Sequence, residues 1–215
     1  MALSAIRANK LRSALTLLGI VVGVFSIIAV MTAMGVLRSS IEQGLAGLGA
    51  NTFRIQKWEV AFSSTPEQRR KWRMRKNITF EQARYVEERL TLADAIGIET
   101  WRDGRTAAWR GEKTNPNISV GGSNLDGYVT NDMTIEIGRN ITDKEMEDGR
   151  RVILLGKTIV EKLFPPSVNP VGEEVRIDGS SYEVIGAFAL KGGALGRNEN
   201  NFCIIPITTF FQKYG

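Results

Sequence analysis

A glycine, a lysine and a threonine stand between a hydrophobic stretch and a helical pattern, where a nucleotide-binding loop would hold phosphates. They are Gly156, Lys157 and Thr158. A complete phosphate-binding loop needs another glycine five residues earlier and a flexible stretch between the two glycines. Arg151 occupies that position, and the intervening Val-Ile-Leu-Leu predicts a buried strand. We therefore expect no nucleotide site here, so that any energy from ATP must come from another chain.

Four carboxylates lie close together further upstream, and they are Asp143, Glu145, Glu147 and Asp148. A catalytic pair of acids needs partly buried carboxyl groups with different environments. Thr142 and Glu145 form the pattern of a capping box, which predicts a short polar helix. We interpret the four acids as the solvated face of that helix.

Other chemistry is limited by composition, because the 215 residues include no histidine and one cysteine, Cys203. Catalytic triads, Cys-His pairs and histidine-based zinc sites are thereby excluded, as are intrachain disulfides and multi-cysteine clusters. Cys203 lies in an apolar stretch and is expected to pack in the core. Asp126-Gly127 resembles the middle of a calcium loop, but the end positions, Gly122 and Met133, carry no oxygen ligand. We expect no catalytic residue, metal ligand or cofactor, and therefore no enzyme.

The strongest signal is a stretch of 25 residues without a charge, Ser13–Leu37. As a helix it is about 37 Å long, enough to cross a hydrocarbon core of about 30 Å. A buried core helix rarely runs so long without a charge, and the apolar part of a cleaved signal peptide is shorter. Arg7, Lys10 and Arg12 precede the span, so the positive-inside rule predicts a cytoplasmic N-terminus. We expect residues 1–12 to be a cytoplasmic interfacial or solvated segment, 13–37 a transmembrane helix and 38–215 an extracytoplasmic domain.

Two features of this pattern suggest contacts. Gly19 and Gly23 are spaced so that a second membrane helix could approach closely, although glycine is common in membrane helices anyway. The net charge of +5 is concentrated in the run RRKWRMRK at 69–76, without which it would be −1. We expect the run to be an exposed loop, or to contact an acidic partner or the outer leaflet; nucleic acid is not expected. Its cations are Arg69, Arg70, Lys71, Arg73, Arg75 and Lys76.

The rest of the chain predicts an α+β domain with strands in excess. We expect the membrane helix to continue over 38–50, and Thr79 to begin a further helix with Gln82 in a capping box. Asp103-Gly104 is typical of a hairpin turn. The segment 63–77 is expected to be a loop or the approach to a helix. Strands are expected at 52–58, 95–101, 105–110, 118–122, 151–155, 173–178, 181–190 and 202–207, with a helix at 157–164 and a glycine-rich loop at 191–197.

The residues that open the span resemble those of MacB-type ABC-transporter permeases, also called the FtsX-like permease family. Members begin with N-x-x-R-x-x-L-T-x-L-G-I-x-x-G, which here runs from Asn9 to Gly23. The stretch 48–51 (LGAN) and the segments VILLGKTIVEKLF, Pro170-Val171-Gly172, YEVIGAF and IIPITTF are similar to the periplasmic core domain of this family. The match is weak over about 57–127.

This resemblance implies a non-enzymatic permease component in the bacterial inner membrane. A separate or fused ATPase would move the membrane helices and, through them, the outer domain. The implied partners are that ATPase, a second permease subunit in a homo- or heterodimer, and a periplasmic adaptor; cargoes in the family include macrolides, peptides and lipoproteins. The chain has one span where members have four, so we expect a fragment or split product, truncated at its C-terminus. The alternative is a single-pass anchored sensor or binding module.

Overall fold

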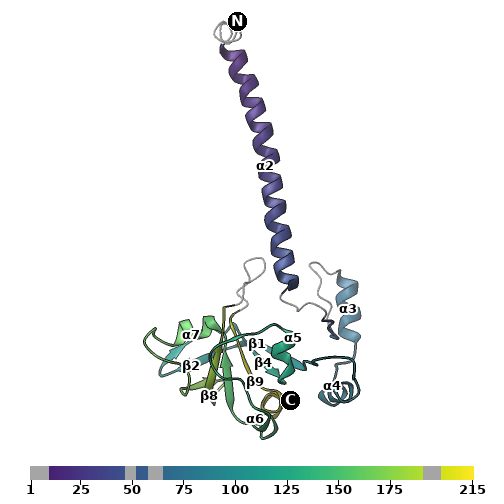
Figure 1. The fold of residues 1–215 in the computed structure, drawn as a ribbon, viewed down its shortest axis with the longest axis vertical. Helices are drawn as coiled ribbons and strands as arrows, with labels where there is room; N and C mark the ends of the chain where they lie inside the picture. Colours follow the sequence, from purple (N-terminus) through teal and green to yellow (C-terminus); the bar gives the residue numbers. More distant parts are fainter. Residues whose placement is uncertain (1–9, 47–51, 58–64, 191–199) are drawn as a thin grey trace. The chain divides into compact units, whose positions relative to one another are not determined.

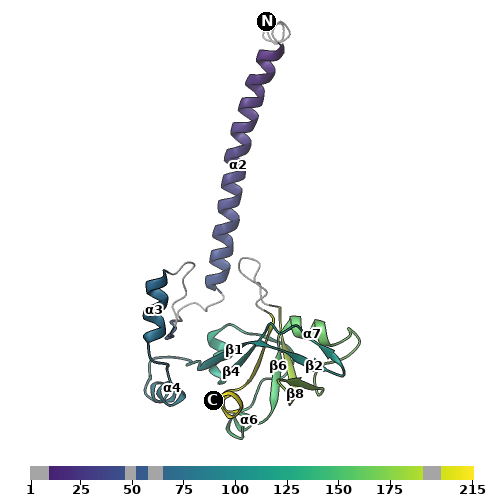
Figure 2. The same ribbon diagram turned by 180° about the vertical axis from the view of Figure 1, so that it is seen from behind.

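The computed structural model describes residues 10–46, 52–57, 65–190 and 200–215. The chain divides into two compact units, one built on the long N-terminal helix and the other on a sheet domain. Figures 1 and 2 show both units from opposite sides. The expectations for residues 1–9, for the stretch 48–51 and for the loop at 191–197 lie outside the described residues.

The first unit is the continuous helix α2, Lys10–Ala46. Its length confirms that the helix continues beyond the apolar stretch, as far as Ala46. No acidic residue lies in its first turn and no basic residue in its last. The hydroxyl groups of Thr16 and Ser26 donate to the carbonyl oxygens of Arg12 and Val22, four residues earlier. These polar groups are therefore satisfied within the helix, as an apolar solvent requires.

The second unit contains one mixed sheet, which has nine strands among the described residues. Their order is β1-β4-β9-β6-β8-β7-β2-β3, and β5 also pairs with β8. The pairs β4–β9 and β6–β8 are parallel, and the other pairs are antiparallel. The strands are β1 (Glu99–Arg105), β2 (Ala107–Trp109), β3 (Glu112–Lys113), β4 (Ile118–Ser123), β5 (Ile135–Gly138), β6 (Val152–Leu155), β7 (Glu174–Ile177), β8 (Ser180–Phe188) and β9 (Phe202–Pro206).

The helices of this unit are short. They are α3 (Pro66–Met74), α4 (Phe80–Glu87), α5 (Asp126–Thr130), α6 (Asp143–Glu147), α7 (Lys157–Leu163) and α8 (Ile207–Tyr214). Capping boxes begin α4 at Thr79 and α6 at Thr142, which confirms both predicted helix starts. A third capping box at Thr65 begins α3, so most of the segment expected to be a loop or a helix approach is helical.

Side chains of the central strands pack on both faces of the sheet, because helices cover both. On β6, Ile153 and Leu155 belong to one core cluster, while Val152 and Leu154 belong to the other. The first cluster includes residues of α7 and α8, and the second includes Tyr128 of α5. A strand buried on both faces reads as a continuous apolar run, which is why Val-Ile-Leu-Leu has no polar alternation.

The expected hairpin turn at Asp103-Gly104 is wrong. Strand β1 runs through both residues, and its pairing with β4 shifts register between Arg102 and Arg105. Gly104 has a φ of 74°, so the pair forms an irregularity within one strand. The tight turn lies instead between β2 and β3, where Arg110 and Gly111 both have positive φ. Glycine after a polar residue suits a bulge as well as a turn, and only strand pairing distinguishes the two.

Two further differences concern the ends of the domain. Residues 52–57 form no strand, and Phe53 and Ile55 are exposed, because alternation makes a strand only where a neighbouring strand accepts its hydrogen bonds. Trp58 lies outside the described residues. Helix α8 follows β9 directly at Pro206, whereas the sequence pattern identified only the strand.

Candidate functional site

The Gly156-Lys157-Thr158 junction has a structural role. Gly156 is the residue before α7, and its N–H donates to the carbonyl oxygen of Phe202 at 2.8 Å. A Cβ atom at this position would lie 2.3 Å from the carbonyl oxygen of Asn200. The Lys157 ammonium group is 2.7 Å from a carboxylate oxygen of Glu136 on β5. Glycine is thus needed for close packing against the start of β9, and the lysine is occupied by an acidic neighbour.

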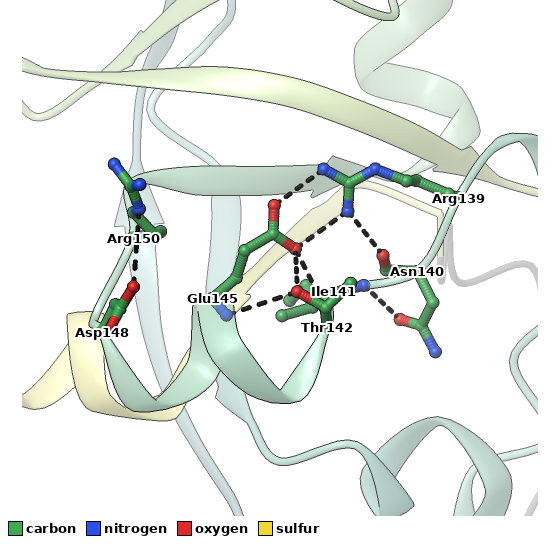
Figure 3. Close-up of polar contacts among 7 residues, drawn as sticks. All are labelled: Arg139, Asn140, Ile141, Thr142, Glu145, Asp148 and Arg150. Atoms are coloured by element: carbon green, nitrogen blue, oxygen red, sulfur yellow. Dashed lines mark hydrogen bonds and ion pairs between the residues drawn. The ribbon is translucent and has the colours of Figure 1, made fainter.

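Among the four clustered carboxylates, Glu145 has distinctive contacts, which Figure 3 draws together with the contact of Asp148. The Arg139 guanidinium group donates two hydrogen bonds to it, at 2.8 and 2.7 Å. The backbone N–H and the hydroxyl group of Thr142 also donate to Glu145, both at 2.9 Å. These contacts, the arginine bonds first, lower the pKa of Glu145 from 4.5 to about 2. Glu145 therefore fastens α6 to the segment after β5, and its expected solvation is wrong.

The other three acids, Asp143, Glu147 and Asp148, are exposed, as predicted. The carboxylate of Asp126 has a structural contact, since it accepts from the N–H of Ile96 at 2.9 Å. The described residues contain no group of three or more acids, cysteines or histidines arranged to hold a metal ion. Cys203 is completely buried in the sheet core, and burial raises the pKa of its thiol. Its predicted packing role is confirmed.

The large apolar side chains of α2 from Leu11 to Leu37 are exposed, with exposed fractions from 45% at Leu37 to 83% at Leu11. Within the described residues, Lys10–Ser39 is long and apolar enough to cross a membrane. A core helix of a water-soluble domain would bury such side chains. A Cβ atom added at Gly19 or at Gly23 would have no neighbouring atom within 4 Å, so the helix surface is open there.

The basic run lies on α3 and the two residues after it. All six of its cations are exposed, while Trp72 among them is buried. Arg75 follows the last residue of α3, and its guanidinium group donates to the carbonyl oxygen of Lys57 at 3.2 Å. The ammonium group of Lys57 in turn donates to the side chain of Asn77 at 2.6 Å. These bonds hold Lys57 beside the end of α3, whereas Arg54 donates to the side chain of Asn131 at the end of α5 at 2.9 Å.

A polar cluster that sequence reasoning missed fastens the last helix, α8, to the sheet. The Tyr214 hydroxyl group donates to Asp178 Oδ2 at 2.9 Å, and Arg105 Nη1 lies 3.4 Å from the same oxygen. The Lys213 ammonium group donates to the carbonyl oxygen of Ile177 at 2.5 Å. Burial lowers the pKa of Lys213 and raises that of Tyr214. The sequence offered one signal, Asp178-Gly179, which predicts a turn and says nothing of its distant partners.

Two hollows open on the described surface of the domain. One of about 400 Å³ is lined by Arg151, Gly172, Glu173, Glu174, Ser181, Tyr182 and Glu183. The other, of about 260 Å³, is lined by Asp132, Met133, Thr134, Phe188, Ala189, Leu190 and Phe202. Within the first, Glu173 is already bound by the indole N–H of Trp109 at 2.9 Å and by Arg110 at 3.0 Å. The carboxylate of Glu173 is therefore already hydrogen-bonded by neighbours within the domain.

Comparison with known proteins gives the same architecture. The sequence model of the MacB-like periplasmic core domain matches residues 13–215. The chain is 29% identical over 210 residues to the macrolide export ATP-binding/permease protein MacB of Rhodopirellula baltica. The aligned region covers 97% of this chain and 30% of that protein. It is 31% identical over 222 residues to the uncharacterized ABC transporter permease YknZ of Bacillus subtilis, covering 100% of this chain and 52% of that one. The chain thus spans about a third to a half of the length of these relatives.

Two solved structures share the fold. The extracellular domain of the noncanonic ABC-type transporter YknZ from Gram-positive bacteria aligns with a TM-score of 0.53 and 22% identity, over 64% of this chain and 66% of that one. The periplasmic region of MacB from Actinobacillus actinomycetemcomitans aligns with a TM-score of 0.56 and 16% identity, over 67% and 62%. The α+β fold class after one N-terminal membrane helix is thereby confirmed. An apolar helix that can anchor the chain in a membrane, an extracytoplasmic domain of this fold and a family match from residue 13 to residue 215 together show that the chain belongs to the MacB-like periplasmic core domain family.

Proposed function

We propose that this chain supplies the first membrane span and the extracytoplasmic domain of an ABC-transporter permease. The observation that carries the proposal is that the family match includes both the apolar helix and the sheet domain. The relatives from Rhodopirellula baltica and Bacillus subtilis align along almost the whole chain, and they are named as an ATP-binding/permease protein and as an ABC transporter permease. In such an assembly the chain acts as a mechanical part, and ATP hydrolysis takes place on a partner subunit.

The form of α2 suits the transmission of movement. Its 37 residues form a helix about 55 Å long, whereas about 20 residues suffice to cross the hydrocarbon core. The helix therefore continues, without a break, past the membrane boundary. A continuous helix resists bending because every backbone hydrogen bond along it would have to distort. A displacement applied to the membrane part by an ATPase is thus carried beyond the membrane surface.

The proposed topology places residues 1–12 in the cytoplasm, residues 13–37 across the inner membrane and residues 38–215 outside it. The charge bias of Arg7, Lys10 and Arg12 before the span supports this orientation. Protease added to intact spheroplasts should digest the sheet domain and leave an N-terminal epitope protected. Protection of the sheet domain would contradict the orientation.

Co-purification tests the partner. The product of the native gene, tagged at its N-terminus and extracted from its own membranes with mild detergent, is expected to bring with it an ABC ATPase and a second permease subunit. A periplasmic adaptor is a further expected component, captured by crosslinking before extraction. Recovery of a kinase or cyclase in place of an ATPase would refute the permease role and favour an anchored sensor.

We further propose that Gly19 and Gly23 form the contact of α2 with another span. At about 100° per residue they lie on one side of the helix, and Gly35 lies about 160° from Gly19. Gly19→Leu with Gly23→Leu should abolish the ATPase stimulation of the assembled transporter while membrane insertion persists. Gly35→Leu is the matched control and should have little effect. Normal stimulation in the double variant would refute the contact.

A further inference from the structure

The exposed face of α3 combines positive charge with one apolar side chain. Trp72 is the buried residue of this helix. At about 100° per residue, Arg70 and Met74 lie opposite Trp72, with Lys71 and Arg73 on either side of them. Met74 is 77% exposed, which is unusual for a methionine in a water-facing helix. A long apolar side chain thus projects from the middle of a cationic surface.

This surface holds the whole net charge of the chain. The segment Pro66–Lys76 contains six cations and one acid, Glu67, so it carries +5. The total for the 215 residues is also +5, which leaves the rest of the chain neutral overall. Glu67 lies in the first turn of α3, where a negative charge is favoured by the helix dipole. The positive potential is therefore local, and it increases toward the C-terminal end of α3.

A membrane is always within reach of this surface, because α2 tethers the domain to one. Nineteen residues separate Ala46, the last of α2, from Pro66, the first of α3. Fully extended, that connection spans at most about 70 Å. Lys57, whose carbonyl oxygen accepts from Arg75 just after α3, follows two exposed apolar side chains in the sequence, Phe53 and Ile55. Cations around exposed apolar groups are the composition of a helix that lies in the headgroup region.

We propose that α3 binds anionic phospholipid headgroups of the membrane that α2 crosses, with Met74 entering the interface among the cations. Basic side chains near an anionic bilayer each contribute a similar attraction, and the attraction decays within a Debye length. An acidic protein would satisfy the charges, but it would give no reason for the exposed Met74 between them. The inference rests only on the membrane anchoring of α2, and it stands or falls independently of the ABC permease role.

A spin label on Met74→Cys in the full chain tests the proposal. Cys203 is completely buried, so the native protein is labelled only at position 74. The chain is inserted into nanodiscs of phosphatidylcholine alone or of phosphatidylcholine and phosphatidylglycerol in equal parts. The measured quantity is the relaxation of the spin label by collision with a water-soluble nickel complex. We expect the label to be protected from this relaxation only in the phosphatidylglycerol discs, and to lose the protection at high salt. Equal relaxation of the label by nickel in the two kinds of disc would overturn the proposal.

Two triple variants in the same background separate a local site from overall charge. Arg70→Gln, Lys71→Gln and Arg73→Gln retain the capping box and Trp72, and should weaken attachment by about 100-fold. Lys113→Gln, Lys162→Gln and Arg176→Gln remove the same charge from exposed positions elsewhere and should retain protection. Loss of protection in both variants would overturn a local site. If soluble polyglutamate shields the label as well as phosphatidylglycerol does, the surface fits an acidic protein and the lipid assignment is wrong.

Discussion

Replacing Glu145 with glutamine should destabilise the sheet domain at neutral pH and should not do so in acid. The carboxylate accepts a forked pair of hydrogen bonds from Arg139, and the pair joins α6 to the end of β5. Glutamine has nearly the same shape and can still accept from the backbone of Thr142, as capping boxes with glutamine do elsewhere in this chain. The substitution therefore removes the charge of the pair and little else.

The expected size follows from the pKa of Glu145, which is lowered from 4.5 to about 2. Because each pKa unit corresponds to about 1.36 kcal/mol, the shift sets a ceiling of about 3.4 kcal/mol. The side chain of Arg139 is 52% exposed, so solvent screens the pair and we expect about 1–2 kcal/mol. A lowered pKa gives stability that is complete above about 4.5 and disappears as the pH falls toward 2.

The assay is reversible urea unfolding of the full chain in mild detergent at low salt, followed by tryptophan fluorescence between pH 7 and pH 2. The difference in the free energy of unfolding between native chain and Glu145→Gln should shrink over the acid part of this range. Glu147→Gln makes the same charge change on the exposed face of α6 and should alter stability by less than about 0.5 kcal/mol. A pH-independent difference, or an equal effect of Glu147→Gln, would refute the reasoning.

Three further predictions concern the sheet domain. Gly156→Ala should cost about 2–3 kcal/mol, measured by the same unfolding assay, because its Cβ would lie 2.3 Å from the carbonyl oxygen of Asn200. Cys203 should resist thiol reagents at pH 8 in the folded chain and react after unfolding, because the thiol is buried and its pKa is raised. Asp178→Asn should speed amide hydrogen exchange in the last turn of α8 by about tenfold, because it weakens the acceptor of the Tyr214 hydroxyl group.

Each of these has its own contrary outcome. Unchanged stability of Gly156→Ala would mean that the segment before β9 moves easily to admit the Cβ atom. Gly35→Ala, on an open helix surface, is the control and should leave the free energy of unfolding unchanged. Rapid labelling of Cys203 without denaturant would contradict its burial. Asp148→Asn, whose carboxylate is 3.9 Å from Arg150 on the surface, is the control for Asp178→Asn. Equal amide exchange rates in the last turn of α8 in these two variants would show that Asp178 does not hold α8 in place.

Features that depend on neighbouring residues were predictable from the sequence. The uncharged stretch indicates a span because length and apolarity alone decide whether a helix can cross a bilayer. The helix starts at Thr79 and Thr142 follow from a cap and its partner three residues later. The apolar run Val152–Leu155 indicated a buried strand, since a strand covered on both faces needs no polar side chain.

Other features arise where distant segments meet, and only the tertiary structure decided them. Asp103-Gly104 has the composition of a turn, and pairing with β4 makes it an irregularity within β1. Glu145 reads as one of four equivalent acids until β5 brings Arg139 to it. Asp178 finds Tyr214 and Arg105 only once the sheet has formed. Local patterns specify conformation through short-range sterics and hydrogen bonds, whereas the partner of a charged group depends on how the whole chain folds.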